Sequence, residues 1–106
     1  MISIIDYGVG NLYSLRCSFE YIGQRVVVTD DPSVISKSDR VILPGVGAFA
    51  DAAAKLSATG LDKVVRAEAA SGKPLLGVCL GMQMLLEKSF EYGEHKGLGL
   101  IKGEVV

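Results

Sequence analysis

Cys79 is the residue of this sequence whose surroundings point most directly to chemistry. It follows an apolar run, Leu75–Val78, that predicts a buried strand, and it precedes a helix-forming run, Met82–Lys88. Gly77 and Gly81 flank it, and a nucleophile lifted on a tight strand-to-helix turn needs such small neighbours because larger side chains would collide there. The free N–H groups at the helix start favour a thiolate. The pattern predicts a catalytic cysteine, and the alternative is a free cysteine that only packs in a core.

Strand-like and helix-like segments must position this cysteine, and they alternate along the chain. Strands are expected at residues Ile2–Asp6, Arg25–Thr29, Arg40–Leu43 and Leu75–Val78, with a further extended run at 100–106. Helices are expected at residues Leu12–Ile22, Pro32–Lys37, Phe49–Ala58, Leu61–Ala70 and 82–90. This alternation predicts an α/β fold with a doubly wound, mostly parallel sheet of the flavodoxin-like kind.

Three glycine-rich segments follow predicted strands, at residues 7–11, 44–47 and 77–81. In parallel sheets the loops after the carboxyl ends of the strands build the binding site, so we expect these segments to meet. Asn11 is the predicted N-cap of the first helix, and Gly23 is its predicted stop signal.

A second cysteine, Cys17, lies in the first predicted helix, one turn from both Tyr13 and Tyr21. It has no flanking glycine turn and no neighbouring base, so we predict a packing role for it. The two tyrosines are interpreted as amphipathic side chains at the margin of the buried face, with a partner-facing surface as the alternative. The apolar positions 12, 15, 19 and 22 of this helix form one stripe that is expected to face the sheet.

Composition narrows the function classes. The chain has 106 residues, a net charge of −1 and scattered basic residues, so nucleic acid is not an expected partner. No apolar run reaches the ~18 residues of a membrane span, and the N-terminus lacks a signal-peptide pattern. We therefore expect a cytoplasmic location. The two cysteines and one histidine fit neither a disulfide framework nor a metal site, so we expect no cofactor.

The end of the sequence is unlike the end of a finished domain. The chain stops within a strand-like run, Gly103–Val106, that has no polar tail. A parallel sheet interrupted there would leave an apolar edge and face unprotected.

Three motifs together carry a resemblance to a known family. They are Asp6–Leu12 (DYGVGNL), Leu43–Phe49 (LPGVGAF) and Gly77–Gln83 (GVCLGMQ). In these motifs the chain resembles class I glutamine amidotransferases and, more narrowly, the glutaminase subunits of imidazole glycerol phosphate synthase. The resemblance covers residues 1–106 and implies that they are the N-terminal half of a glutamine amidotransferase domain.

The resemblance implies a chemical role for two of the loops. Cys79 would attack the side-chain amide of glutamine and form a thioester. The N–H of Leu80 would stabilise the oxyanion, joined by an amide of the Gly45-Val46-Gly47 loop once that loop is suitably turned. Losing one such donor typically lowers the rate by about 10²–10³.

The resemblance also implies contacts with substrate and partner. Gln83, one turn after Cys79, would help to hold the glutamine. Tyr7, Gly8 and Asn11 lie at the predicted strand ends and would face a partner, the (β/α)₈-barrel cyclase subunit of imidazole glycerol phosphate synthase. In the family this cyclase receives the ammonia and builds the imidazole ring for histidine biosynthesis.

The catalytic base of the family has no counterpart in this sequence. The resemblance implies a His-x-Glu pair, yet the only histidine is His95, in a charged, glycine-flanked loop typical of solvated histidines. We therefore predict that these 106 residues alone are a poor or inactive glutaminase. The alternative is a non-catalytic flavodoxin-like binding or assembly half-domain. Faster alkylation of Cys79 than of Cys17 would favour the enzyme.

Overall fold

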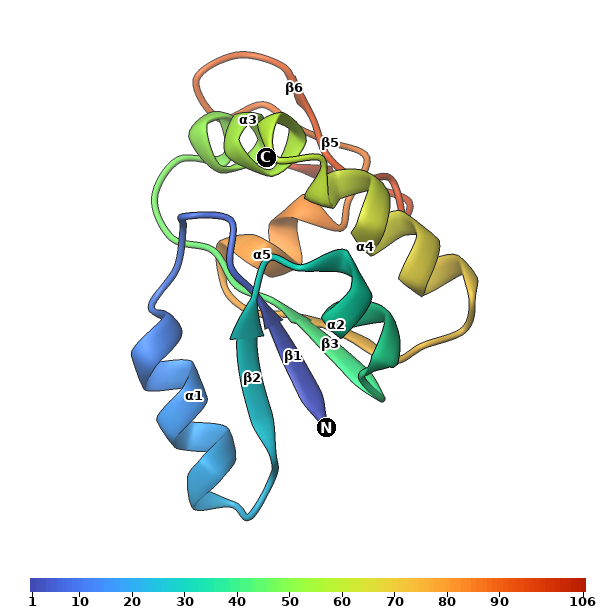
Figure 1. Ribbon diagram of the computed structural model, residues 1–106. Helices are drawn as coiled ribbons and strands as arrows, with labels where there is room; N and C mark the ends of the chain where they lie inside the picture. Colours follow the sequence, from blue (N-terminus) through green and yellow to red (C-terminus); the bar gives the residue numbers. More distant parts are fainter.

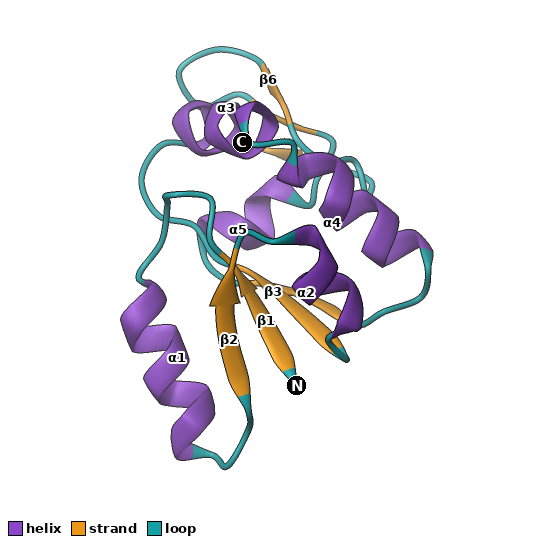
Figure 2. Ribbon diagram, in the orientation of Figure 1, coloured by secondary structure: helices purple, strands orange, loops and turns teal.

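Four parallel strands form the larger of two sheets in the computed structural model, which describes residues 1–106 (Figures 1 and 2). The strands are β1 (Ile2–Ile5), β2 (Val26–Thr29), β3 (Arg40–Leu43) and β4 (Leu75–Gly77), in the spatial order β2-β1-β3-β4. The register places Ile2 beside both Val26 and Arg40, and Ile42 beside Leu76. The predicted parallel α/β sheet is confirmed, and the carboxyl ends of its strands lie at one end of the molecule.

The helices fall where the sequence predicts them, except the last. They are α1 (Leu12–Tyr21), α2 (Pro32–Lys37), α3 (Phe49–Ala58), α4 (Leu61–Ala70) and α5 (Leu80–Met84). At the start of α1 the Asn11 side chain accepts a hydrogen bond from Ser14 N (3.4 Å), and Gly23, at φ +86°, follows its end. Both predicted helix signals are confirmed. None of the helices has the length and hydropathy that a membrane crossing requires.

The two faces of the sheet are covered unequally. Side chains of α2 to α5 pack on one face, where Ile5, Val41 and Leu43 belong to a core of 14 buried residues. The other face carries a cluster of only three buried residues, among them Ile4 and Ile42, and α1 is the helix that packs on it. Neighbouring strand residues such as Ile4 and Ile5 thus serve different layers, as strand geometry requires.

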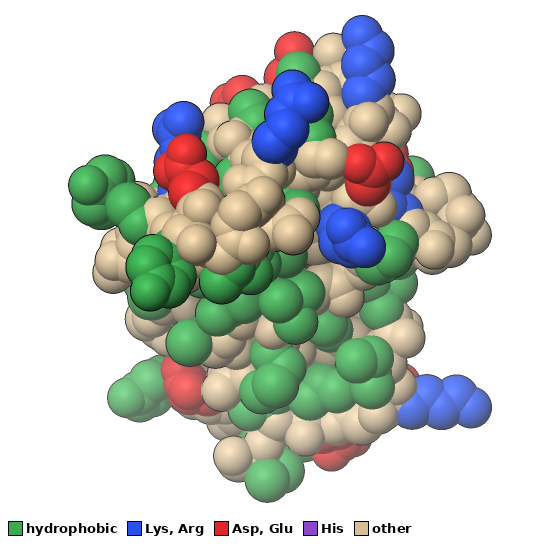
Figure 3. Space-filling model, turned by 90° about the horizontal axis from the view of Figure 1, so that it is seen from below, with side chains coloured by type: hydrophobic (Ala, Val, Ile, Leu, Met, Phe, Trp, Pro, Cys, Tyr) green, Lys and Arg blue, Asp and Glu red, His purple; other side chains and the backbone are tan.

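Part of the face under α1 stays open. Leu12, Leu15 and Phe19 are half-buried against the sheet, but Ile22 is 64% exposed, so the last position of the predicted stripe is wrong. Beside α1 a groove crosses β3 and β4, lined by Ile2, Phe19, Arg40, Val41, Ile42, Pro74, Leu75 and Leu76. Hydrophobic side chains accordingly gather on the underside of the molecule (Figure 3). The outer edge of β4 has no strand partner.

The chain after Met84 contradicts the prediction of a helix to residue 90. It forms a small mixed sheet with the order β6-β5-β7, from β5 (Lys88–Ser89), β6 (His95–Lys96) and β7 (Glu104–Val105). The Met84 carbonyl accepts a hydrogen bond from Leu98 N (2.7 Å), and the Leu85 carbonyl accepts one from Leu100 N (2.9 Å). The returning chain therefore takes the acceptors that a longer helix would use, and α5 ends early.

Candidate active site

Cys79 sits at a sharp bend between β4 and α5. Its backbone has φ 55° and ψ −121°, a conformation that residues other than glycine rarely adopt, and the residue is exposed. Before the bend, Val78 N donates a hydrogen bond to Leu43 O (3.0 Å), and after it Gly81 N donates one to Val78 O (3.0 Å). The predicted strand-to-helix turn with an exposed cysteine at its tip is confirmed.

The two glycines beside Cys79 are required by the packing of backbone on backbone. A Cβ atom at Gly81 would overlap the Leu43 carbonyl oxygen, and one at Gly77 would lie 2.6 Å from Met82 Cα. Neither neighbouring atom belongs to a side chain that could rotate away. The steric reason for the Gly-x-Cys-x-Gly pattern is therefore confirmed.

The three glycine-rich segments converge on the cysteine, as predicted. They line a pocket of about 160 Å³ together with the first turns of α1, through Asn11, Ser14, Leu15, Ser18, Pro44, Gly45, Val46, Val78 and Cys79. The two serines are pocket residues that the sequence analysis missed. With Asn11 they recur at i, i+3 and i+7, so a polar stripe along α1 was the signal that could have revealed them.

The loop after β3 lies directly against the bend at Cys79, residues 77–81, which we call the elbow. Gly45 is buried, and a Cβ atom there would lie 2.7 Å from Gly81 N, so the two backbones are in contact. Val46 and Gly47 are exposed, whereas the side chain of Leu80 is buried in the core. The polar groups that this part of the site offers to a ligand are thus all backbone groups, because none of these side chains is polar.

Gln83 lies one turn after Cys79. Its backbone N donates a hydrogen bond to Cys79 O (3.4 Å), and its side-chain Oε1 is buried without a hydrogen-bond partner. A buried amide oxygen without a donor is unfavourable unless a ligand or another chain supplies one. Gln83 is not among the residues that line the pocket beside Cys79, and its expected contact with a substrate stays a prediction.

One of the three residues expected to face a partner points inward instead. The Tyr7 side chain is 3% exposed, and its hydroxyl donates a hydrogen bond to Pro44 O (2.6 Å), so a partner-facing role for this side chain is wrong. Its ring fills space in the main core beside Met84, and burial raises the pKa of Tyr7 to about 12. Gly8 and Asn11 are exposed, and their predicted partner contact stays a prediction.

Cys17 also differs from its prediction. It is exposed on α1, and neighbouring Tyr13 and Tyr21 are 79% and 91% exposed, so a packing role for Cys17 is wrong. The reason is that α1 packs on the sheet along one narrow stripe and leaves its other sides in solvent.

The pocket around Cys79 contains no histidine and no carboxylate among its lining residues. His95 lies in β6, in the smaller sheet, where its Nε2 atom contacts Tyr92 O (3.2 Å). The described residues therefore place the candidate nucleophile Cys79 in this pocket without a neighbouring general base.

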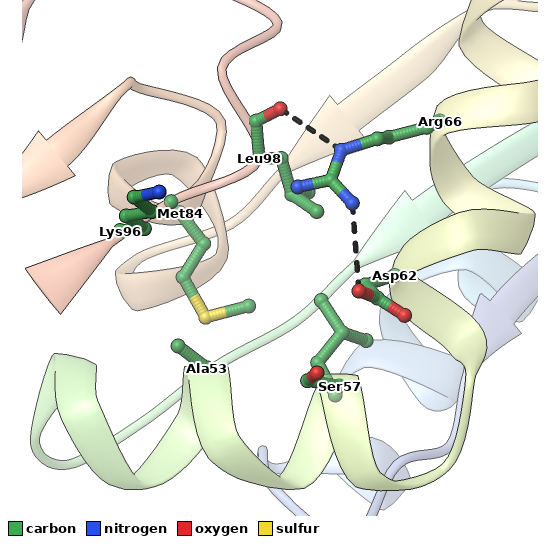
Figure 4. Close-up of a pocket in the computed structure, with 9 residues that line it drawn as sticks. Ala53, Ser57, Asp62, Arg66, Met84, Lys96 and Leu98 are labelled. Carbon is green, nitrogen blue, oxygen red and sulfur yellow. Dashed lines mark hydrogen bonds and ion pairs between the residues drawn. The ribbon is translucent and has the colours of Figure 1, made fainter.

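A second pocket lies between α3, α4 and the chain around β6 (Figure 4). Arg66 Nε donates a hydrogen bond to Leu98 O (3.2 Å), and Arg66 Nη1 pairs with Asp62 Oδ2 (3.4 Å). These contacts hold α4 to the returning chain that ends α5. The pocket includes none of the residues that the sequence singles out for chemistry.

Comparison with known proteins defines the class of protein. Residues 3–106 match the CobB/CobQ-like glutamine amidotransferase domain, and the chain belongs to this family. Two crystal structures share its fold at low sequence identity. A glutamine amidotransferase gives a TM-score of 0.81 at 18% identity, over 97% of this chain and 54% of that one. A putative peptidase E from Listeria monocytogenes gives a TM-score of 0.76 at 17% identity, over 94% of this chain and 62% of that one.

Within that class, the chain is similar to curated subunits of one enzyme. The chain is 53% identical, over its whole length and 51% of the relative, to the imidazole glycerol phosphate synthase subunit HisH of Sulfurimonas denitrificans. It is 52% identical to the HisH subunit of Aquifex aeolicus, over 97% of this chain and 50% of that protein. The HisH subunit of Bacillus licheniformis is 52% identical over the whole chain. The chain thus spans about half the length of the curated relatives that it matches.

Proposed function

We propose that this chain supplies the nucleophile half of a glutaminase that hydrolyses glutamine for imidazole glycerol phosphate synthase. The observation that carries the proposal is the exposed Cys79, held at φ 55° on a strand-to-helix turn against the loop after β3. Membership in a glutamine amidotransferase family and about 50% identity to HisH subunits support this chemistry.

The proposed reaction begins with attack of the Cys79 sulfur on the side-chain carbonyl carbon of glutamine. The carbonyl oxygen becomes an oxyanion, which the N–H of Leu80 and an amide of the Gly45–Gly47 loop would stabilise. The carbon–nitrogen bond then breaks, the nitrogen takes the proton given up by the thiol and leaves as ammonia, and a thioester remains on the sulfur. Water hydrolyses the thioester to glutamate and restores the thiol.

Substrate binding in this proposal uses Gln83. Its unpartnered Oε1 would accept a hydrogen bond from an N–H group of the bound glutamine, which would satisfy a buried acceptor. The ammonia would pass to a cyclase subunit that contacts the strand ends near Gly8 and Asn11. That partner is proposed because the relatives are named as subunits of a synthase. We further propose a cytoplasmic location, where such biosynthetic substrates are made.

The chain by itself is proposed to be a poor glutaminase, since its pocket lacks a base to activate the thiol and protonate ammonia. The test measures ammonia release from glutamine by the purified chain, with and without the separately produced second half of the Sulfurimonas denitrificans HisH subunit. We expect little release by the chain alone and hydrolysis by the mixture. Cys79→Ser should lower the rate of ammonia release by the mixture about 10³-fold or more. Cys17→Ser should leave that rate unchanged.

Two outcomes contradict the proposal at different points. Robust Cys79-dependent release by the chain alone would show that the missing base is not needed. A mixture that forms a stable complex in gel filtration but releases no ammonia would instead favour the non-catalytic half-domain. The lack of a base in the pocket is the specific observation behind that second candidate.

A further inference from the structure

Tyr7 is a buried polar side chain that contacts the start of the proposed oxyanion loop, and the proposed reaction does not use it. It lies two residues after the end of β1, and its ring lies in the main core. Its hydroxyl donates to Pro44 O at 2.6 Å, a bond that joins positions 37 residues apart in the chain. The Met84 sulfur is 3.9 Å from the same hydroxyl oxygen, too long to compete for its single proton.

Pro44 is held from a second side as well. A Cβ atom at Gly10, which has φ +121°, would lie 2.9 Å from Pro44 Cβ, so the loop after β1 packs tightly on the proline ring. Proline has no backbone N–H, so its carbonyl is the polar group through which the rest of the protein can hold it. Tyr7 supplies that contact from inside the core.

The next residues differ in how firmly they are held. Gly45 is buried, and its Cα faces the elbow backbone, where an added Cβ would come within 2.7 Å of Gly81 N. Gly47 is exposed with φ +86°, and a Cβ there would meet nothing within 4 Å. Val46 is 53% exposed. The loop is therefore anchored at its Pro44 end and free at its Gly47 end.

We propose that Tyr7 is a positioning residue for the glutaminase reaction, whose hydroxyl fixes the Pro44 carbonyl so that the loop reorients only beyond Gly45. The inference rests on the proposed function. A loop peptide that turns about a fixed end returns to one place beside the Cys79 sulfur, which is what a preorganised oxyanion donor requires. Without the anchor, the donor would occupy a range of positions.

The test separates attack on a carbonyl from simple alkylation of the same sulfur. All proteins carry Cys17→Ser, so that Cys79 is the single thiol. The first probe is the γ-(p-nitrophenyl) ester of L-glutamate: the sulfur attacks the ester carbonyl, a thioester forms, and p-nitrophenolate leaves without needing a general acid. The second probe is iodoacetamide, where the sulfur displaces iodide from a saturated carbon and no oxyanion forms.

Tyr7→Phe keeps the ring and removes the hydroxyl. We expect it to slow ester acylation about tenfold, the factor that corresponds to one ordinary hydrogen bond, while alkylation changes less than about twofold. Tyr13→Phe, which removes an exposed hydroxyl, should change neither rate. Equal rates in Tyr7→Phe and the parent would overturn the inference. An equal fall in both rates would also overturn it, since Tyr7 would then only maintain the fold.

Hydrogen exchange of the loop amides gives a readout that is independent of reactivity. Loss of the anchor should speed exchange at residues 45–47 of Tyr7→Phe, with little change in the β1 and β3 amides. Unchanged loop exchange would overturn the inference. If the parent protein is acylated no faster than its Cys79→Ser variant, the proposed function is at fault, and the exchange result still decides whether Tyr7 anchors the loop.

Discussion

The two cysteines of this chain are both free and exposed, yet their surroundings differ in every other respect. Cys17 lies inside the regular helix α1, where its neighbours are solvated and Tyr13 is 79% exposed. Cys79 has a left-handed backbone conformation, and the segments beside it touch backbone to backbone. Exposure alone therefore does not distinguish a candidate nucleophile, whereas a backbone that neighbouring segments hold in a rare conformation does.

The contrast extends to the nearest tyrosines. Tyr7, behind the loop that faces Cys79, is buried and hydrogen-bonded to the backbone. Tyr13, beside Cys17, is in solvent, and a hydrogen bond with the Cys17 side chain raises the pKa of its phenol. A buried tyrosine thus lies behind the loop beside one thiol, and an exposed tyrosine lies beside the other. Four predictions test this contrast.

The largest expected difference is in acylation by the γ-(p-nitrophenyl) ester of L-glutamate. Cys79→Ser should reduce the rapid, stoichiometric release of p-nitrophenolate to the level of free thiols, because the exposed Cys17 has no oxyanion donors beside it. Cys17→Ser should leave the release intact. Stopped-flow absorbance measures both. A burst that survives Cys79→Ser and disappears in Cys17→Ser would reverse the assignment of the nucleophile.

The next effect is on stability, through the glycine after the cysteine. Gly81→Ala places a methyl group on the Leu43 carbonyl oxygen, so we expect a loss of about 3 kcal/mol or more, at the upper end for overpacking. Ser18→Ala, next to Cys17 on the exposed helix, should change the free energy of unfolding by less than about 0.5 kcal/mol. Urea denaturation checks both. Equal, small changes would mean that the elbow is not tightly packed.

Alkaline pH should destabilise the folded protein through ionisation of Tyr7, which lies behind the loop that faces Cys79. Its pKa is about 12 in the folded protein and 10.0 in an exposed phenol, so the folded state favours the neutral form. The stabilisation is complete below pH 10 and is lost as the pH rises towards 12. Two pKa units correspond to about 3 kcal/mol. Denaturation curves at pH 9 and 11.5 should show a drop that is much smaller in Tyr7→Phe.

The smallest expected effect is on the free energy of unfolding, which should change in different directions when each cysteine is replaced by glycine. Cys79→Gly relieves a positive φ angle and should leave the protein as stable or raise the free energy of unfolding by about 1 kcal/mol. Cys17→Gly weakens the middle of α1 and should lower the free energy of unfolding by roughly 0.5 kcal/mol. Thermal or urea unfolding compares them. If both substitutions destabilise the chain equally, Cys79 is not strained.

Much of the site could be predicted from residues close together in the chain. The bend at Cys79 follows from an apolar strand, a helix-forming run and two glycines within five residues, and Asn11 caps α1 because its side chain reaches the N–H of Ser14. Convergence of the three glycine-rich loops follows from the rule that parallel strands share one carboxyl end. These inferences need only local sterics and the handedness of the chain.

The inward turn of Tyr7 was not predictable in the same way. Its motif marks a loop, and nothing within a few residues shows that Pro44, far along the chain, supplies an acceptor in the core. The early end of α5 has a similar origin, because its last carbonyls bond to residues 98–101 rather than to the next helical turn. The residues after Met84 favour a helix, and nothing in their types indicates that residues 98–101 compete for these carbonyl groups.

The order of strands and helices along the chain, the bend at Cys79 and the need for glycine at position 77 were determined by the sequence itself, because they depend on excluded volume and hydrogen bonds between near neighbours. The need for glycine at position 81 comes from the Leu43 carbonyl, which only the fold brings there. Tertiary structure alone decided which face of α1 is solvated, where α5 stops, and that Tyr7 holds the Pro44 carbonyl. Those outcomes depend on contacts between residues far apart in the chain, where burial and the supply of hydrogen-bond partners are set by the whole fold.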